Sequence, residues 1–244
     1  MLPRESPRSL SVNEHTSKQF DVEMEGIRSG VLSMGGLVET QIARAIVALK
    51  SSDIDLIDAV AADELAINQM QVDLDQQCSQ IIARRQPTAI DLRMVLTVVK
   101  VVNELERIGD EIKKIAYKAQ QMQRPERLSN VRFHEITRAA ELAEDNLQLA
   151  LDAFARLDVK AAAQVISADE AIDAAFLAIL RQLISYMMED PRTITPALEI
   201  VFIAKSIERI GDHAKNISEY VIYMVKGKDV RHVTLEEIER EVMG

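Results

Sequence analysis

Residues 103–116 read NELERIGDEIKKIA, and residues 205–218 read KSIERIGDHAKNIS. The two stretches share the string Glu-Arg-Ile-Gly-Asp and lie 102 positions apart. Such a match could be a coincidence between helices rich in Glu, Arg and Ile, but the same order of helices around both stretches favours a duplication. We therefore expect two similar halves, each ending in a helix that carries this string.

Apolar residues around the first stretch recur at the spacing of an α-helix, at Val95, Val98, Val101, Leu105, Ile108, Ile112 and Ile115. The same spacing continues outward and predicts six long helices, several of which end at a proline or glycine. Their approximate spans are 20–50, 53–85, 91–123, 131–157, 158–190 and 195–226, with one short amphipathic helix after Val233. The predicted fold class is all-α, with six long helices forming two tandem three-helix bundles related by internal duplication.

The predicted helices and the breaks between them divide the chain into four parts. A polar, proline-containing segment over 1–17 is expected to be a flexible arm. The first three-helix bundle is expected over 18–124 and the second over 129–227, with a C-terminal tail over 228–244. Because the connections between helices are short, consecutive helices should run antiparallel.

A second match links the middle helices of the two halves. Ala62-Asp63-Glu64 repeats as Ala168-Asp169-Glu170, at an offset of 106 positions. Insertions and deletions in the loops of duplicated units change the offset by a few residues in this way. The same offset pairs Glu39 with Asp145 in the first helix of each half.

The composition agrees with long helices and narrows the class of partner. Glycine (8) and proline (6) are scarce among 244 residues, and aromatic residues make up only 4%. The formal net charge of −10 argues against nucleic acid as the main partner. The sequence shows no signal peptide and no apolar run that we expect to span a bilayer, which favours a cytoplasmic protein. The single cysteine, Cys78, is expected in the core.

The repeated string places two carboxylates four residues apart, at Glu106 and Asp110 in the first half and Glu208 and Asp212 in the second. Residues at this spacing share one face of a helix, where like charges repel by a few tenths of a kcal/mol. The face is apolar upstream of each pair, so these carboxylates should be partly buried. Paired and partly desolvated carboxylates need cations, hydrogen bonds or protons.

Two accounts of these acids remain open. In one, basic side chains such as Arg107, Lys113 or Arg209 neutralise them. In the other they bind a metal ion, for which clustered oxygen ligands are suited, with Glu39 and Asp145 as further ligands. His213 is a weaker candidate ligand, since a lone histidine on a helix is more often a surface residue.

Gly109 and Gly211 occupy the middle of predicted helices, where glycine costs roughly 1 kcal/mol relative to alanine. The repetition of that cost suggests that another helix approaches closely at both positions. The sequence has no glycine-rich phosphate loop, no Cys-x-x-Cys and no His-Glu-x-x-His. A non-enzymatic protein is therefore expected, with a carboxylate-metal enzyme or a metal-free helical scaffold as the alternatives.

Several strings together resemble the PhoU family, the accessory and regulatory proteins of phosphate-specific transport. They are the two Glu-Arg-Ile-Gly-Asp strings with their flanks, residues 34–39 (MGGLVE), 84–93 (RRQPTAIDLR), 152–156 (DAFAR) and 186–190 (YMMED). The resemblance covers nearly the whole chain. It implies two three-helix bundles, each with a metal site at its Glu-x-x-x-Asp motif, for which iron, zinc, manganese and magnesium are all possible.

The resemblance also implies a function and a set of partners. It implies negative control of the phosphate-starvation response and modulation of phosphate uptake. The partners would be the ATPase or membrane components of the phosphate ABC transporter and the sensor histidine kinase of the phosphate two-component system. A cytoplasmic homodimer that reaches the membrane only through these partners is expected. The candidacy of Asp145 as a ligand rests on spacing and not on the resemblance.

Overall fold

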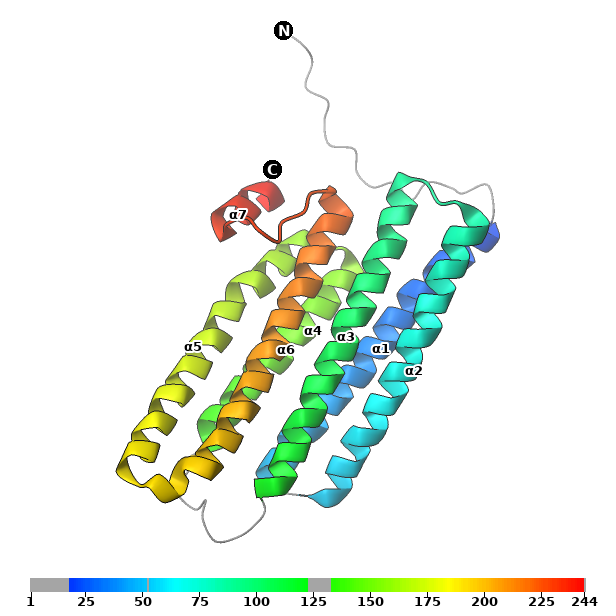
Figure 1. The fold of residues 1–244 in the computed structure, drawn as a ribbon. Helices are drawn as coiled ribbons and strands as arrows, with labels where there is room; N and C mark the ends of the chain where they lie inside the picture. Colours follow the sequence, from blue (N-terminus) through cyan, green and yellow to red (C-terminus); the bar gives the residue numbers. More distant parts are fainter. Residues whose placement is uncertain (1–17, 52, 123–132, 244) are drawn as a thin grey trace.

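The computed structural model describes residues 18–51, 53–122 and 133–243, and all the regular elements in these ranges are helical (Figure 1). The six long helices and the short C-terminal helix expected from the sequence are all present. A 3-10 turn over Pro191–Thr193 precedes α6. The helices are α1 (Lys18–Ser51), α2 (Ile54–Arg85), α3 (Ala89–Met122), α4 (Phe133–Arg156), α5 (Val159–Glu189), α6 (Ile194–Lys226) and α7 (Leu235–Met243). The predicted arm over 1–17 and the predicted junction between the two bundles, at residues 124–129, lie outside the described residues.

Local sequence signals set several of the helix ends. The side chain of Asp53 accepts a hydrogen bond from the Asp55 amide at the start of α2, and Asp158 caps α5 in the same way. Such caps satisfy amide groups that have no partner within the helix. Gly227 ends α6 with a φ of 76°, a left-handed conformation that glycine adopts without strain.

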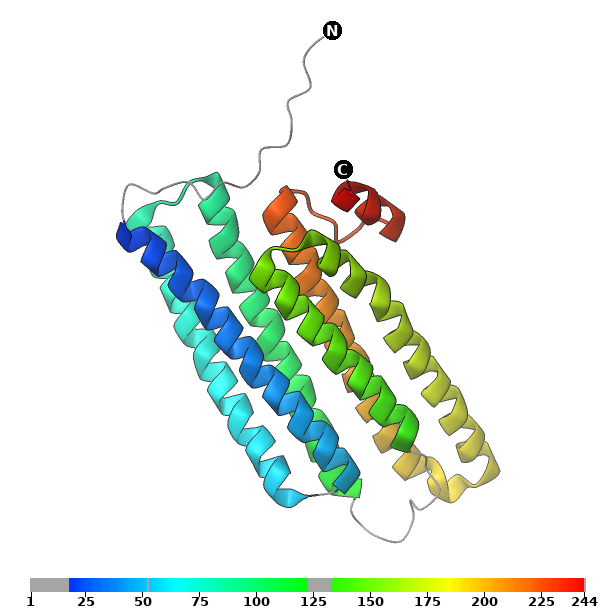
Figure 2. The ribbon, with the colours of Figure 1, turned by 180° about the vertical axis from the view of Figure 1, so that it is seen from behind.

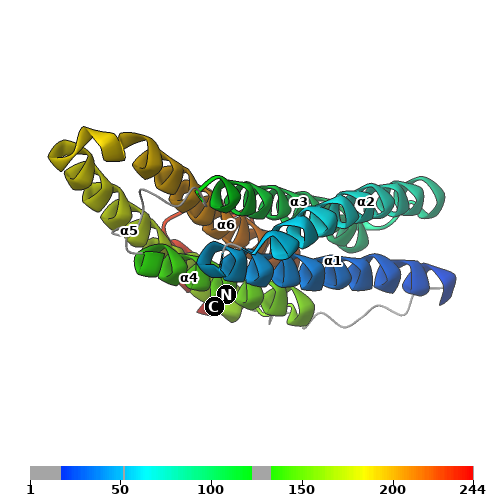
Figure 3. The ribbon, with the colours of Figure 1, turned by 90° about the horizontal axis from the view of Figure 1, so that it is seen from below.

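The two halves pack side by side along their length (Figures 1 and 2). In the middle of the molecule α3 packs against α6 and α1 against α4, while α2 and α5 lie at opposite outer edges (Figure 3). The halves therefore bury apolar faces against each other as well as within themselves.

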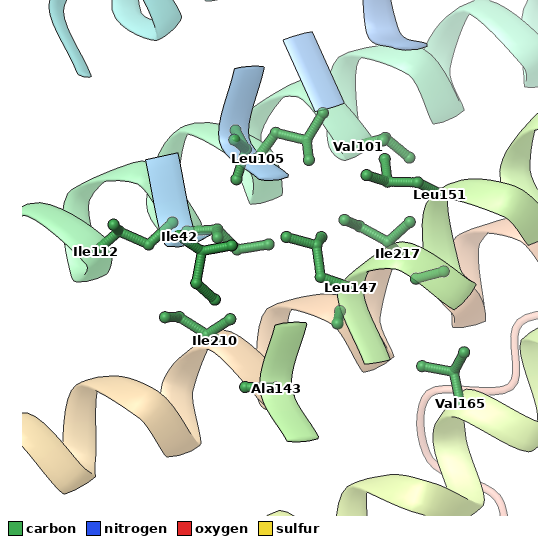
Figure 4. Close-up of a cluster of buried hydrophobic side chains, with 14 of the residues drawn as sticks. Ile42, Val101, Leu105, Ile112, Ala143, Leu147, Leu151, Val165, Ile210 and Ile217 are labelled. Atoms are coloured by element: carbon green, nitrogen blue, oxygen red, sulfur yellow. The ribbon is translucent and has the colours of Figure 1, made fainter. Parts of the chain in front are cut away.

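Figure 4 shows part of the core that results. Ile42 and Leu105 from the first half meet Leu147 and Ile210 from the second, and all four are at most 1% exposed. Burial of a Leu or Ile side chain contributes roughly 1.5–3 kcal/mol, so a contiguous core of this kind joins the halves firmly. The expectation for Cys78 is confirmed, because it is 1% exposed and burial raises its thiol pKa to about 12.

Equivalent hydrogen bonds reveal the true register of the duplication. Gln41 on α1 donates its side-chain amide to the Val60 carbonyl at 3.1 Å, and Asn146 on α4 donates to the Val165 carbonyl at 3.4 Å. These pairs are related by an offset of 105. The offset of 106 inferred from the Ala-Asp-Glu match is therefore wrong by one residue, which is about 100° of rotation around a helix.

The two mid-helix glycines lie where neighbouring helices approach closely, as the sequence suggested. A Cβ added to Gly109 would lie 3.3 Å from Ile67 Cδ1 on α2 and 3.3 Å from Gln41 Oε1. A Cβ on Gly211 would lie 2.9 Å from both Ile172 Cδ1 and Asp169 Oδ1 on α5. Ile67 and Ile172 are again related by an offset of 105. The glycines let α2 and α5 pack directly against α3 and α6.

The expectation about apolar runs needs a correction. Two helices, α1 and α5, contain an 18-residue window long and apolar enough to pass a length and composition test for a membrane span. Half of the α1 window is buried inside the protein, as in many core helices, but only 17% of the α5 window is buried. Asp169, Glu170, Asp173 and Arg181 lie within α5 and interrupt its apolar residues in the sequence.

The glycine contacts predict an asymmetric effect of alanine on stability. Gly109→Ala should change the free energy of unfolding by less than about 1 kcal/mol, because the gain in helix propensity offsets a mild contact. Gly211→Ala should destabilise by about 1–2 kcal/mol, because buried Asp169 and Ile172 must move. Chemical denaturation of both variants measures the difference, and an equal effect at the two positions would contradict the packing described.

Candidate metal centres

The first carboxylate cluster lies where α3 faces α2. Glu106 and Asp110 are half-buried on α3. This agrees with the prediction from the sequence, in which both acids continue a helix face that is apolar upstream. Glu64 on α2 is 4% exposed and lies 3.0 Å from Nζ of Lys113. Burial raises the pKa of Glu106, and the nearby charges of Asp110 and Glu64 raise it further. The helix pair thus holds three acids close enough to repel one another.

The second cluster repeats this arrangement between α6 and α5. Burial raises the pKa of Asp212, and the charges of Glu208, Asp169 and Asp173 add to the shift. Asp169 is 2% exposed, its own pKa is raised by burial, and its Oδ2 lies 3.1 Å from Nζ of Lys215. Two acids from α5 therefore join the two that the motif supplies.

Glu64 and Asp169 are equivalent acids of the two clusters, and the sequence did not predict them as site residues. They are related by the 105 offset, and each pairs with a lysine at the same point of the following helix, Lys113 or Lys215. Both acids belong to the repeated Ala-Asp-Glu strings. The identical letters aligned Asp63 with Asp169, whereas packing aligns Glu64 with Asp169. A search for buried acids in the corrected register would have found them.

Glu39 and Asp145 are placed differently from the expectation. Burial raises the pKa of Glu39, and the charge that adds to the shift is that of Asp152 on α4. Glu144, the residue equivalent to Glu39 at the offset of 105, has a pKa raised by burial and by Asp145, Glu141 and Glu39. Asp145 itself is exposed. Glu39 therefore belongs to an acidic surface between α1 and α4, and its expected equivalence with Asp145 is wrong.

His213 is buried, contrary to the expectation of a surface histidine. Its Nδ1 lies 2.6 Å from Oε2 of Glu104 on α3, across the boundary between the halves. Asn216 and Tyr220 also donate hydrogen bonds to Glu104, at 3.2 and 3.3 Å. Burial alone would raise the pKa of Glu104, but the hydrogen bonds outweigh it and hold this pKa below its ordinary value. The cluster ties α3 to α6.

Basic side chains neutralise part of each candidate centre. Lys113 and Lys215 pair with the buried acids Glu64 and Asp169, and Lys205 pairs with Glu208. Arg209 instead reaches Glu111 on α3, at 3.1 Å. The account in which basic side chains neutralise the acids therefore has partial support, mainly from lysines. Burial, and after it the neighbouring carboxylates, still raise the pKa of Glu106 and of Asp212.

The residues present also fit a bound cation. Asp169 Oδ1 is a buried oxygen atom without a hydrogen-bond partner, and the only polar contact of the buried Glu64 Oε2 is its ion pair with Lys113 Nζ at 3.0 Å. Each lies beside the partly buried carboxylates of its motif, and a set of carboxylate oxygens is chemically suited to hard or borderline cations. Among the described residues, no three His, Cys, Asp or Glu side chains already lie close enough together to enclose a metal ion. Binding would therefore require side-chain rotations, including release of the lysines.

The second cluster predicts a stabilising substitution. In the presence of a chelator at pH 7, Asp212→Asn should raise the free energy of unfolding by a few tenths to about 1 kcal/mol, because it removes repulsion from Glu208, Asp169 and Asp173. Thermal unfolding monitored by circular dichroism measures the change. Asp158→Asn, at an exposed helix cap, serves as the control for loss of one negative charge. Destabilisation by Asp212→Asn under these conditions would contradict mutual repulsion in this cluster.

Comparisons with known proteins match both halves of the chain. A sequence model of the PhoU domain matches residues 31–119 and 136–221. A phosphate-specific transport system accessory protein PhoU homolog of Pseudomonas putida is 45% identical over 234 residues, which are 96% of this chain and 91% of that protein. The accessory protein PhoU of Escherichia coli K12 is 43% identical, covering 97% of each chain. The crystal structure of PhoU from Pseudomonas aeruginosa superposes with a TM-score of 0.83 at 44% identity, covering 86% of this chain and all of that one.

Proposed function

The chain belongs to the PhoU family, and from that premise we propose that it is a metal-binding adaptor that restrains the phosphate-starvation response. The family makes it an accessory, regulatory protein of phosphate transport and not an enzyme. The observation that carries the proposal is the match of both halves and nearly the full length of the chain to accessory proteins of the phosphate-specific transport system. The restraint of the phosphate-starvation response and the identity of the partners are proposed in addition to this family membership.

In this proposal the protein links the phosphate ABC transporter to its sensor histidine kinase. When phosphate is plentiful, the adaptor holds the kinase in the state that turns the response off. A body of long helices with a shared core suits the role, because it holds the surfaces of both halves in a fixed relation. The protein acts in the cytoplasm, as a homodimer, and meets the membrane through its partners.

The carboxylate clusters give the adaptor two equivalent cation sites. Glu106, Asp110 and Glu64 would hold a metal in the first half, and Glu208, Asp212 and Asp169 in the second. A bound cation would screen the repulsion that raises the pKa values of these acids, and would leave the lysines free. Iron, zinc, manganese and magnesium all accept such oxygen donors. The metal would stabilise the surface of each α2–α3 and α5–α6 pair that faces a partner.

The regulatory role predicts a loss of repression. A bacterial strain that lacks its own PhoU protein, and carries a reporter driven by a phosphate-starvation promoter, should express the reporter constitutively. This chain should restore low expression in phosphate-rich medium, because its helices present the surfaces that the transporter and the kinase contact. Reporter activity in rich and phosphate-poor medium measures the effect. If the chain is produced in soluble form and expression remains constitutive, the adaptor function is wrong.

The metal proposal predicts a stepwise loss of bound ion. Protein purified without chelator should contain metal in both halves. Asp110→Asn should remove the metal bound by the first half, and Asp212→Asn the metal bound by the second. The double variant should remove nearly all of it, because each site loses a ligand that its lysine-paired acid cannot replace. Elemental analysis by mass spectrometry gives the metal content per chain.

A matched control for this measurement is Glu25→Gln, on an exposed part of α1. Its metal content should equal that of the wild type. Metal content that is unchanged in the double variant would place the ion elsewhere. Protein with no metal in any form would favour the metal-free scaffold, in which Lys113 and Lys215 are the permanent counterions of the buried acids.

A further inference from the structure

The surface of α1 is hollowed along its C-terminal half, beside the start of α2 (Figure 2). The hollow has a volume of about 490 Å³, is open to solvent and presents mostly apolar atoms. Gly36, Ala43 and Val47 on α1 and Leu56 on α2 line what we call the α1 groove. Val47 is 50% exposed, and a Cβ added to Gly36 would meet no atom within 4 Å. No described part of the chain therefore covers this apolar groove.

The shape of the α1 groove suits a helix. Gly36, Ala43 and Val47 share one face of α1, because they are separated by seven and four residues. The face they span is about 17 Å long, or about three helical turns. An amphipathic helix can place its apolar stripe along a groove of this kind. The molecule already contains an example of such packing, since α7 lies on α5 and buries Ile238 and Val242.

Carboxylates border the α1 groove on the side of α4, which packs beside α1 (Figure 2). Glu39 lines the groove, and its pKa is raised by burial and by the charge of Asp152 on α4. Burial also raises the pKa of Glu144, and the acids around it on α4 and α1 raise it further. These carboxylates therefore repel one another along one side of the apolar groove.

The cations nearby neutralise only part of this acidic border. Glu141 pairs with a lysine of α1, and Asp152 pairs with an arginine of its own helix. Glu39, Glu144 and Asp145 have no ion-pair partner in the part of the chain that the structure describes. A ligand that brings positive charge to this border would reduce the repulsion between the acids.

The combination of apolar groove and acidic border limits what can occupy the surface. An anionic membrane or a nucleic acid would be repelled by the acids. The α7 helix of a second copy would be repelled too, because α7 carries four glutamates and one arginine. A helix with an apolar stripe and lysines or arginines along one flank complements both parts of the surface.

We propose that the α1 groove and the acids of α4 beside it are a docking surface for a basic amphipathic helix of a partner protein. The apolar stripe of that helix lies on Ala43 and Val47, and its basic flank faces Glu144 and Asp145. The inference rests on the adaptor role of the proposed function, for which it supplies one contact face and the chemistry of the partner segment. Because exposed charges contribute to the contact, its affinity falls as salt concentration rises.

A binding experiment on the full chain tests this surface. The probe is a fluorescently labelled peptide of leucine and lysine, stapled to remain helical over about three turns. Fluorescence anisotropy should show saturable binding of this peptide, and much weaker binding of a leucine–glutamate peptide of the same pattern. Val47→Arg should raise the dissociation constant roughly tenfold and Asp145→Lys roughly fivefold, because each variant places a cation against the basic probe.

Matched controls separate the groove from the general charge of the protein. Val72→Arg changes a residue that is 58% exposed on α2, and Glu239→Lys changes an exposed acid on α7. Each alters the net charge as much as its counterpart in the groove, and neither should change the dissociation constant. Gly36→Gln is an uncharged groove variant that the open space at Gly36 accommodates, and it should also weaken binding. Circular dichroism checks that every variant is folded, and Gly36→Gln replaces any groove variant that is not.

Several results would overturn the inference. One is binding that the folded groove variants leave unchanged, and another is binding that the controls weaken as much as the groove variants do. Phosphatidylglycerol vesicles that bind the wild type but not Val47→Arg would make lipid the occupant. A dimer that Val47→Arg dissociates in sedimentation equilibrium would make a second copy the occupant.

The reporter assay distinguishes failure of this inference from failure of the adaptor function. Val47→Arg should weaken repression of the reporter, whereas Val72→Arg should not. If the wild type and Val47→Arg repress equally well, the adaptor function stands and the α1 groove is not its contact face. If the wild type does not repress but the peptide binds as expected, the adaptor function is wrong and the groove remains a docking surface.

Discussion

The close approach of helices at two mid-helix glycines is the constraint on which the candidate centres depend. Because Gly109 and Gly211 have no side chain, Ile67 and Ile172 pack almost onto the backbones of α3 and α6. Glu64 and Asp169, three residues before those isoleucines, are thereby buried beside the motif carboxylates. At Gly211 even a Cβ would crowd Asp169 and Ile172, whereas the contacts at Gly109 are milder and only a side chain larger than alanine would push α2 outward. The glycine in the repeated string is thus part of the site, although it contributes no functional group.

Burial of several carboxylates together has an energetic cost that the protein offsets only in part. Lys113 and Lys215 each pair with one buried acid, while burial and neighbouring charges still raise the pKa of Glu106 and Asp212. A purely structural ion-pair network would be expected to satisfy its buried oxygens more fully. The remaining electrostatic cost is the physical reason for proposing a cation at the equivalent place in both halves.

The two halves have nevertheless diverged at the boundary between them. The boundary between them contains the Glu104–His213 hydrogen bond, whose counterpart positions, Ser206 and Glu111, carry different chemistry. Duplication preserved the interior because the core and the glycine contacts restrict it. The positions that meet across the boundary were freer to change.

The sequence by itself determined the helical class, the approximate helix ends, the duplication and the motif acids Glu106, Asp110, Glu208 and Asp212, because periodicity and repetition are local properties of the chain. The repeated Glu-Arg-Ile-Gly-Asp strings and the other short motifs also indicated membership of the PhoU family. Only the tertiary structure decided the register of the middle helices, since a one-residue shift leaves the pattern of letters almost unchanged but turns each side chain by about 100°. That rotation is why Glu64, and not Asp63, is the equivalent of Asp169, and why Glu144, and not Asp145, is the equivalent of Glu39. The burial of His213 against Glu104 was decided separately, by the packing of α3 on α6.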